Sequence, residues 1–266
     1  MSVAVELPPE TPAAVALEVL PETGTPNVFV VPAYNEAENL PRLLAELEAR
    51  PALFPPGSRL IIVDDGSVDA TAQLVGGYAG PLPVELVRLD TNQGPGAAFR
   101  AGFAAALATC SSDALVVTLE ADTTGDLDAL PQMLERAAAG AELVLAAWVM
   151  VNVSRFRRAL SAGAAFAVRR TLGVRARTVS SFFRVYRAST LRAAAERYGD
   201  ELIRERGFAC KAELLSKLTA LGARIEEVPV GLDGSRRAGR SHMPIARTIV
   251  AYWRMILRAQ FERARA

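Results

Sequence analysis

The sequence is poor in cysteine and histidine, and this scarcity excludes several kinds of site. Among its 266 residues are two cysteines and one histidine. Cys110 and Cys210 lie far apart and lack the spacing of a zinc site or a disulfide framework, which favours a reducing, cytoplasmic setting. The single histidine, His242, excludes a multi-histidine metal centre, and any serine–histidine mechanism would have to use it.

Long hydrophobic runs and a targeting signal are also missing. No stretch of about 18 uncharged apolar residues occurs, so the sequence predicts no membrane-spanning helix. Residues 1–26 contain acids and prolines but no basic segment, which is not typical of a signal peptide. We expect a mobile tail there.

The formal net charge of +1 conceals opposite charges in the two halves of the chain. Residues 1–150 hold 6 basic and 20 acidic residues, whereas residues 151–266 hold 24 and 9, so the halves carry about −14 and +15. The basic half predicts an anionic partner such as phosphate groups, nucleic acid or an acidic membrane surface. The alternative is that the two halves attract each other. Nucleic acid ranks last and is not expected, because the arginines are scattered without interleaved aromatic residues.

Strand and helix patterns alternate through the first half. The predicted strands are 27–32, 59–65, 84–89, 114–119 and 142–147. Helices are predicted to begin at Asn35, Asp69, Gly94 and Leu127. This alternation is the signature of an α/β fold of Rossmann-like type, with a mostly parallel central sheet covered by helices on both faces.

The pattern is looser beyond residue 150. Helices are predicted at 153–173, 189–198 and 210–221, strands at 183–187 and 225–230, and a loop at 231–243. A chain of 266 residues suits one substantial domain. We therefore expect one domain at 27–243, with halves at 27–150 and 151–243, followed by an amphipathic helix at 244–266.

Polar residues follow three of the predicted strands directly, at 32–36, 64–69 and 120–126. Because parallel strands direct their carboxyl ends to the same edge of a sheet, these groups should converge on one crevice. Glu120 and Asp122, one residue apart, offer the oxygen ligands that suit Mg²⁺ or Mn²⁺. For any single acid, the alternative is a turn or a helix terminus.

A glycine-bearing loop at 92–99 follows the third strand and enters a helix. Close backbone approach and a helix N-terminus both favour anions, so the loop is typical of a phosphate site. It does not fit the dinucleotide fingerprint, since Phe99 replaces the last glycine, and no Walker sequence occurs.

Together these segments resemble family-2 glycosyltransferases of the GT-A fold. The motifs are Pro-Ala-Tyr-Asn-Glu at 32–36, Val-Asp-Asp-Gly-Ser at 63–67, Asn-Gln-Gly-Pro-Gly at 92–96 and Glu-Ala-Asp at 120–122, in the family's order and spacing. The chain is most similar to the polyprenyl-phosphate branch, which is dolichyl-phosphate mannose synthase-like. Segments 207–213 and 236–243 resemble the branch's later motifs more loosely. The resemblance implies an inverting, metal-assisted transfer of a sugar from a GDP- or UDP-sugar to a polyprenyl or dolichyl phosphate lipid.

The resemblance also implies roles for single residues. The half at 27–150 would bind the nucleotide-diphosphate sugar through Pro32, Ala33, Tyr34, Glu36, Asp65, Gly94, Glu120 and Asp122. The Mg²⁺ or Mn²⁺ ion would be held by Glu120, Asp122 and Thr124. The half at 151–243 would bind the phosphate of the lipid acceptor through Ser181, Arg184, Arg187, Arg240 and Ser241. The catalytic candidates are Asp122, Arg184 and Arg240.

Several positions depart from the family pattern. Glu120 stands where an aspartate is usual, Thr124 where a stronger polar ligand is common, and Pro95 and His242 where lysine is common. These departures leave two alternatives open: a transferase that acts on a soluble or protein-bound hydroxyl, and a non-catalytic nucleotide-sugar-binding protein.

The acceptor decides whether a base is needed. A lipid phosphate is already ionised, whereas a hydroxyl has to lose a proton to a carboxylate. Asp126 and Glu213 are the candidates for that base, although Glu213 is interpreted more simply as an acid on a helix surface. We therefore favour the phosphate acceptor.

The predicted helix at 244–266 sets apolar residues against arginines. Such a helix can lie in a bilayer interface, with its arginines near anionic headgroups, which would make the protein peripheral on the inner face of the membrane. The equal alternative is that it packs on the domain.

Overall fold

The structure, a computed structural model, describes residues 25–151, 155–174, 176–238 and 244–265. Its strands are β1 (Asn27–Ala33), β2 (Arg59–Asp64), β3 (Val84–Arg88), β4 (Leu115–Thr118), β5 (Leu143–Val151), β6 (Arg184–Arg187) and β7 (Ile225–Asp233). Its helices are α1 (Leu40–Glu48), α2 (Thr71–Gly76), α3 (Pro95–Thr109), α4 (Leu130–Ala138), α5 (Arg155–Leu172), α6 (Ala188–Tyr198), α7 (Cys210–Ala220) and α8 (Ile245–Arg265), with 3₁₀ helices η1 (Pro51–Leu53), η2 (Leu127–Ala129) and η3 (Gly199–Ile203). The predicted tail lies, through residue 24, outside the described residues.

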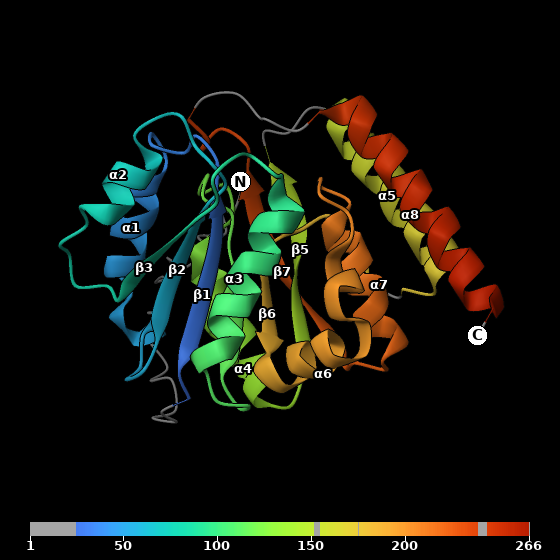
Figure 1. The fold of residues 1–266 in the computed structure, drawn as a ribbon, viewed down its shortest axis with the longest axis horizontal. Helices are drawn as coiled ribbons and strands as arrows, with labels where there is room; N and C mark the ends of the chain where they lie inside the picture. Colours follow the sequence, from blue (N-terminus) through green and yellow to red (C-terminus); the bar gives the residue numbers. More distant parts are fainter. Residues whose placement is uncertain (1–24, 152–154, 175, 239–243, 266) are drawn as a thin grey trace, which may run out of the picture.

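The strands form one sheet in the order β3-β2-β1-β4-β6-β5-β7 (Figure 1). β1 pairs in parallel with β2 and β4, β2 with β3, and β5 with β7. Among the strands of the described residues, only β6 runs antiparallel to its neighbours, β4 and β5. The predicted α/β fold with a mostly parallel sheet is therefore confirmed.

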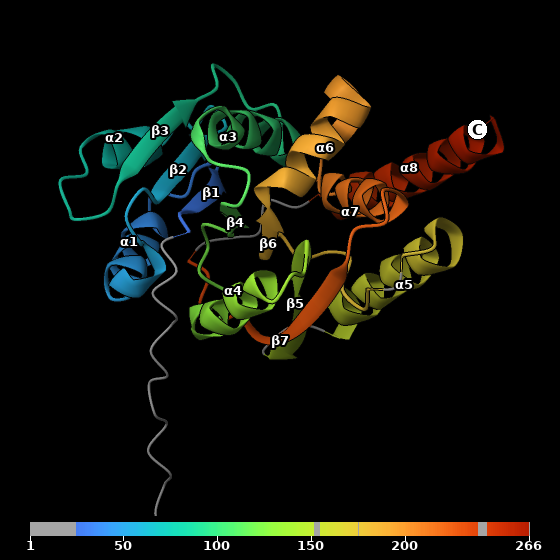
Figure 2. The ribbon, with the colours of Figure 1, turned by 90° about the horizontal axis from the view of Figure 1, so that it is seen from below.

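Helices cover both faces of the sheet, and the sequence of β1 shows why. Successive side chains of a strand point to opposite faces. Val28 and Val30 pack in the core under α3, while Phe29 and Val31 pack in the core under α1 and α4. Figure 2 shows α3 and α6 on one side of the sheet and α1 and α4 on the other. An apolar run without alternation is what a parallel strand buried on both faces requires.

The first helix begins later than the sequence predicts. Asn35 was expected to cap it, yet α1 begins at Leu40 and Asn39 is its N-cap residue. Asn35 has a positive φ of 54°, and its side chain accepts a hydrogen bond from the backbone of Val68. The residues just before α1 are therefore not helical, and they contact the loop that follows β2.

The predicted C-terminal helix is α8, which packs alongside α5 (Figure 1). Its Tyr252, Met255 and Ile256 are buried in the core that also holds α3. Trp253 and Phe261 are 56% and 67% exposed. The helix thus packs on the domain through one face and leaves apolar side chains on another. In the described ranges, no helix combines the length and apolar sequence needed to cross a membrane.

Helix α3 approaches the sheet so closely that Gly102 leaves no room for a side chain. A Cβ atom there would lie 2.3 Å from Cγ1 of Val30 and 3.1 Å from Cγ2 of Val63. Overpacking of this kind typically costs about 1–3 kcal/mol, so we predict that Gly102→Ala lowers the free energy of unfolding by that amount in chemical denaturation. Gly163→Ala in α5 meets nothing within 4 Å and should not lower it. Equal effects of the two changes would contradict the close approach.

Candidate active site

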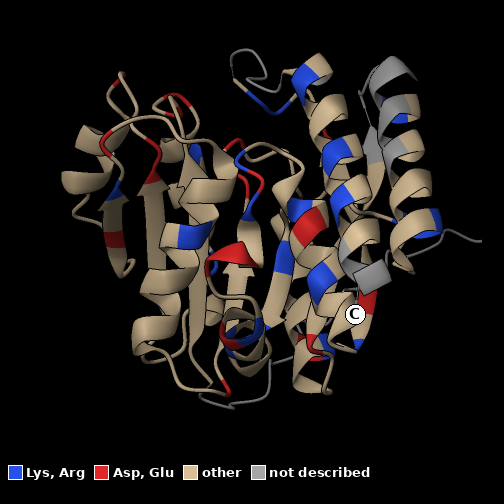
Figure 3. Cartoon of the chain, turned by 45° about the vertical axis from the view of Figure 1, so that its right-hand side comes forward, with Lys and Arg blue, Asp and Glu red and all other residues tan. Residues whose placement is uncertain are grey.

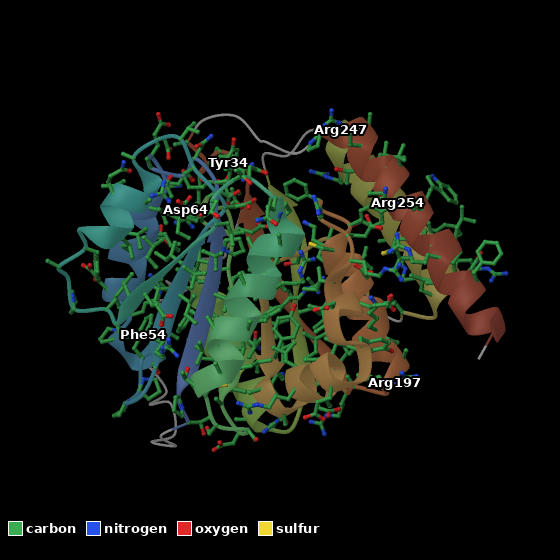
Figure 4. All side chains as sticks on the ribbon, in the orientation of Figure 1. Tyr34, Phe54, Asp64, Arg197, Arg247 and Arg254 are labelled. Carbon is green, nitrogen blue, oxygen red and sulfur yellow. The ribbon has the colours of Figure 1, made fainter. Side chains whose placement is uncertain are left out.

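A cavity of about 1220 Å³ opens at the edge of the sheet where the parallel strands end. Its wall includes the loops after β1, β2 and β4, the start of α3, the segment 204–208 and part of α8. Seven predicted nucleotide-sugar residues line it: Pro32, Ala33, Tyr34, Glu36, Asp65, Gly94 and Glu120. Figure 4 shows Tyr34 at this edge, with Arg247 and Arg254 along α8. The strand ends therefore converge as predicted, while contact with a ligand stays a prediction.

The loops after β1 and β2 hold each other in place. The backbone N–H of Asn35 donates to Oγ of Ser67 at 2.9 Å, and that of Glu36 donates to Oγ1 of Thr71 at 2.9 Å. Asp69 accepts from the N–H of Ala37. Small hydroxyl and carboxylate side chains thus bind the free amides of the neighbouring loop, which explains why both loops keep a defined shape.

Asp65 fixes the glycine loop. Its two carboxylate oxygens accept the backbone N–H groups of Gln93 and Gly94, each at 2.8 Å. Gly94 has a φ of 90°, which suits glycine and permits the sharp entry into α3. Burial raises the pKa of Asp65, and the two amide hydrogen bonds oppose that shift. Asp65 lines the cavity and also supports the loop beside it.

Asp122 is almost fully buried, and both of its carboxylate oxygens have partners. Oδ1 accepts the backbone N–H and the hydroxyl of Thr124 at 3.0 and 2.8 Å. Oδ2 forms an ion pair with Arg237, which lines the cavity. Thr124 therefore orients Asp122 through a donated hydrogen bond, and its contact with a metal ion stays a prediction.

Two more carboxylates surround the Asp122–Arg237 pair. Burial, and then the charge of Asp122, raises the pKa of Glu120 to about 7, while Lys211 and Arg237 oppose this shift. Burial also raises the pKa of Glu36, against a hydrogen bond from Asn39 and the charge of Arg237. The carboxylates of Asp122, Glu120 and Glu36 therefore all lie within electrostatic range of Arg237.

The donor set suits Mg²⁺ or Mn²⁺ only in part. Over the described ranges, no group of three or more His, Cys, Asp or Glu side chains could hold a metal ion. Mg²⁺ is commonly bound by one or two carboxylates, with substrate phosphates completing its octahedral shell. Asp122 and Glu120 match that arrangement, provided that Arg237 leaves Oδ2 of Asp122.

The residues predicted to bind the acceptor phosphate do not reach the cavity. Ser181 is fully buried, and its Oγ accepts the backbone N–H of Phe183 at 2.9 Å. Arg184 is 1% exposed and donates to the carbonyl of Val179 and the hydroxyl of Tyr186. Neither lines the cavity. Burial in the core removes both from the predicted phosphate site, and with it the predicted catalytic contact of Arg184.

Arg187 lies at the opposite edge of the sheet. Because β6 is antiparallel to β4, Arg187 pairs with Leu115 at the start of β4, whereas Arg184 pairs with Thr118 at its end. The guanidinium of Arg187 donates to the carbonyl of Ala137. Its predicted role is therefore wrong. The remaining candidates, Arg240 and Ser241, lie outside the described residues, as does His242.

Both carboxylates considered as bases are engaged elsewhere. Glu213 is 3% exposed, so the predicted helix-surface position is wrong. It accepts the backbone N–H groups of Arg204 and Glu205 and pairs with Lys217. Asp126 is exposed, accepts the N–H of Asp128 and does not line the cavity.

The sequence did not predict two basic residues at the site, Arg237 and Lys211. Arg237 comes from the same arginine-rich loop as Arg240, the residue that the sequence predicted for the site. Lys211 lies 4.0 Å from the ring centre of Phe182 and 5.3 Å from that of Phe208, a cation–π arrangement. Burial lowers its pKa, and Glu120 opposes the shift. No local pattern singles out a lysine in the first turn of a helix.

A mostly parallel sheet covered by helices on both faces, with acids and a glycine loop at its carboxyl edge, has the architecture of a GT-A glycosyltransferase. The family model described as glycosyl transferase family 2 matches residues 28–196, and the chain belongs to that family. It is therefore a glycosyltransferase, as the four motifs predicted.

Two relatives carry related names. Over 246 residues the chain is 32% identical to an undecaprenyl-phosphate mannosyltransferase of Micrococcus luteus, covering 89% of this chain and 96% of that protein. Over 167 residues it is 35% identical to an undecaprenyl-phosphate 4-deoxy-4-formamido-L-arabinose transferase of Pseudomonas aeruginosa, covering 62% of this chain and 48% of that protein. The match thus spans about half the length of the second relative.

Solved structures agree on the fold. Glucosyl-3-phosphoglycerate synthase from Mycobacterium tuberculosis, in complex with phosphoglyceric acid, aligns with a TM-score of 0.62 at 19% identity, over 89% of this chain and 80% of that one. S. aureus TarS 1–349 in complex with UDP-GlcNAc aligns with a TM-score of 0.58 at 20% identity, over 88% and 66%.

The raised pKa of Glu120 predicts a pH-dependent stability. Its pKa is about 7 in the folded protein against 4.5 when free, so the folded state binds more protons between these values. Stability from this group is therefore lost as the pH rises through that window. In the presence of a chelator, Glu120→Gln should raise Tm more at pH 8 than at pH 5. The exposed change Glu135→Gln should shift Tm equally at both pH values, and equal shifts for Glu120→Gln would contradict the prediction.

Proposed function

We propose that this protein transfers a sugar, with inversion, from a nucleotide-diphosphate sugar to a polyprenyl phosphate lipid. The observation that carries the proposal is the cavity itself, in which acids and a glycine loop face a wall rich in arginine. The arginines of this wall are Arg204, Arg206, Arg237, Arg247, Arg254 and Arg258. The names of both undecaprenyl-phosphate relatives support the acceptor class.

The acid side of the cavity suits the donor. The N-terminus of α3 offers a favourable dipole to a diphosphate, and the loop before it, at 92–94, lines the cavity. A bound Mg²⁺ or Mn²⁺ would stabilise the negative charge of the departing diphosphate. Arg237 pairs with Asp122 at this point, so a metal ion would replace it at Oδ2 and Arg237 could then contact the diphosphate.

The basic side suits an anionic acceptor. Arg206 and Arg247 line the cavity and form no ion pair within the part of the chain that the structure describes. An oxygen of the lipid phosphate would attack the anomeric carbon while the bond to the diphosphate breaks, and the diphosphate leaves with the bonding electrons. An ionised phosphate needs no base. Neither Asp126 nor Glu213 lines the cavity, so neither of the two predicted bases is placed to serve a hydroxyl acceptor.

A transfer assay tests the proposal. Purified protein is incubated with a panel of GDP- and UDP-sugars, with Mg²⁺, Mn²⁺ or a chelator, and with either polyprenyl phosphate or soluble hydroxyl acceptors. We predict metal-dependent transfer to the lipid phosphate. Asp122→Asn should reduce it at least about a hundredfold, because charge stabilisation at the leaving group is lost. The exposed change Asp128→Asn should not. Transfer to soluble hydroxyls alone would overturn the proposal.

We further propose that α8 contacts the surface of an anionic membrane. The apolar residues of its outer stripe are all more than half exposed: Val250, Trp253, Leu257 and Phe261. Figure 3 shows basic residues recurring along the same helix. An exposed apolar row beside arginines is typical of a helix that lies in a bilayer interface, and α8 also lines the cavity that would receive the lipid phosphate.

Flotation with vesicles that contain anionic lipid tests this contact. Replacing Trp253 and Phe261 by glutamine should abolish flotation, because their burial in the interface supplies much of the apolar attraction. Leu74→Gln changes a partly exposed apolar residue on α2 and should have no effect. Flotation that survives the double change at α8 would refute the proposed contact.

A further inference from the structure

Glu205 is a buried acid in the cavity wall, and it binds two arginines of α8. Its side chain is 1% exposed. Oε2 lies 2.7 Å from Nη2 of Arg254, and Oε1 lies 2.9 Å from Nη2 of Arg258. The three residues are called the Glu205 clamp below. The clamp joins the C-terminal helix to the segment 204–208.

The same segment is held from α7. The carboxylate of Glu213 accepts the backbone N–H groups of Arg204 at 2.9 Å and of Glu205 at 2.8 Å. Charge-assisted bonds in a site of low dielectric are strong and directional. The backbone at Glu205 is therefore fixed by one acid, and its side chain by two guanidinium groups.

The segment in turn presses against the glycine loop. The carbonyl of Arg206 accepts the backbone N–H of Gly96, at the start of α3, at 2.8 Å. A Cβ atom on Gly96 would lie 2.0 Å from the carbonyl oxygen of Glu205, and one on Gly94 would lie 2.6 Å from that of Arg206. Only glycine permits this approach, so the loop that faces the donor packs directly on the segment that the clamp holds.

We propose that Glu205 is a positioning residue, through which α8 sets the shape of the donor site. The clamp holds the segment 204–208 against the glycine loop, and this contact fixes the loop for a nucleoside diphosphate. The inference rests on the proposed nucleotide-sugar donor. It adds that the affinity for the donor depends on α8, which the clamp ties to the segment 204–208.

Equilibrium binding of UDP and GDP, with Mg²⁺ or Mn²⁺, tests this dependence by calorimetry. Glu205→Gln removes the charge but keeps the side-chain volume, and we expect about tenfold weaker binding of the nucleotide that the wild type prefers. In the transfer assay, KM for the donor should rise by a similar factor with kcat retained. Arg254→Gln should weaken binding in the same direction. Its side chain is 61% exposed, so it serves if Glu205→Gln fails to fold.

The chain offers a matched control in Glu226, a second acid beside two arginines. Glu226 lies 3.5 Å from Arg136 and 3.4 Å from Arg224 and does not line the cavity, so Glu226→Gln should leave the affinity unchanged. The variant that combines Glu205→Gln with Arg254→Gln should bind the nucleotide no more weakly than Glu205→Gln alone, because both changes break the same ion pair.

Three outcomes would overturn the inference. The first is wild-type affinity in Glu205→Gln with only a lower Tm, and the second is additive losses in the combined variant. The third is a wild-type protein that binds neither nucleotide. This result would overturn the proposed donor as well, whereas the first two would overturn only the role of Glu205.

Discussion

Parallel pairing of β1 with β2 on one side and β4 on the other is the constraint on which the site depends. Ala33 lies opposite Asp64, and Val30 lies opposite Thr118, so the residues that follow all three strands emerge at one edge. Hydrogen bonds between the loops after β1 and β2 then hold the residues at this edge in place. An antiparallel β4 would send Glu120 and Asp122 to the far edge, where Arg187 of the antiparallel β6 lies.

The opposite charges of the two halves meet at this edge. Arg236 pairs with Glu46 and Arg237 pairs with Asp122, so part of the charge division draws the halves together. Other arginines of the basic half line the cavity, and Arg206 and Arg247 are not neutralised there by an acid of the described residues. Attraction between the halves therefore accounts for some arginines at this edge, and the proposed affinity for an anion concerns others.

The sequence predicted those parts of the molecule that local pattern controls. An apolar run followed at once by an acid locates both a strand and its end, so the fold and seven lining residues could be foreseen. The strand at 183–187 was predicted as well, but the positions of Ser181, Arg184 and Arg187 were not, because the direction of β6 and the burial of Arg184 depend on strands far away in the chain. The predicted exposure of Glu213 was wrong for the same reason. Its position in a helix was predictable, but the segment at 204–205 that covers it was not.

The position of β6 has a consequence for how the chain acquires its structure. β5 lies between β6 and β7, and both of these neighbours come after it in the sequence. During synthesis, β1 to β4 can pair as soon as they emerge, whereas β5 has no partner until residue 184 or later has left the ribosome. The nine-residue apolar strand β5 thus has both edges unpaired while more than thirty further residues are synthesised. The second half of the chain therefore supplies the two strands, β6 and β7, that cover the edges of β5 and prevent aggregation there. It also supplies arginines of the cavity wall.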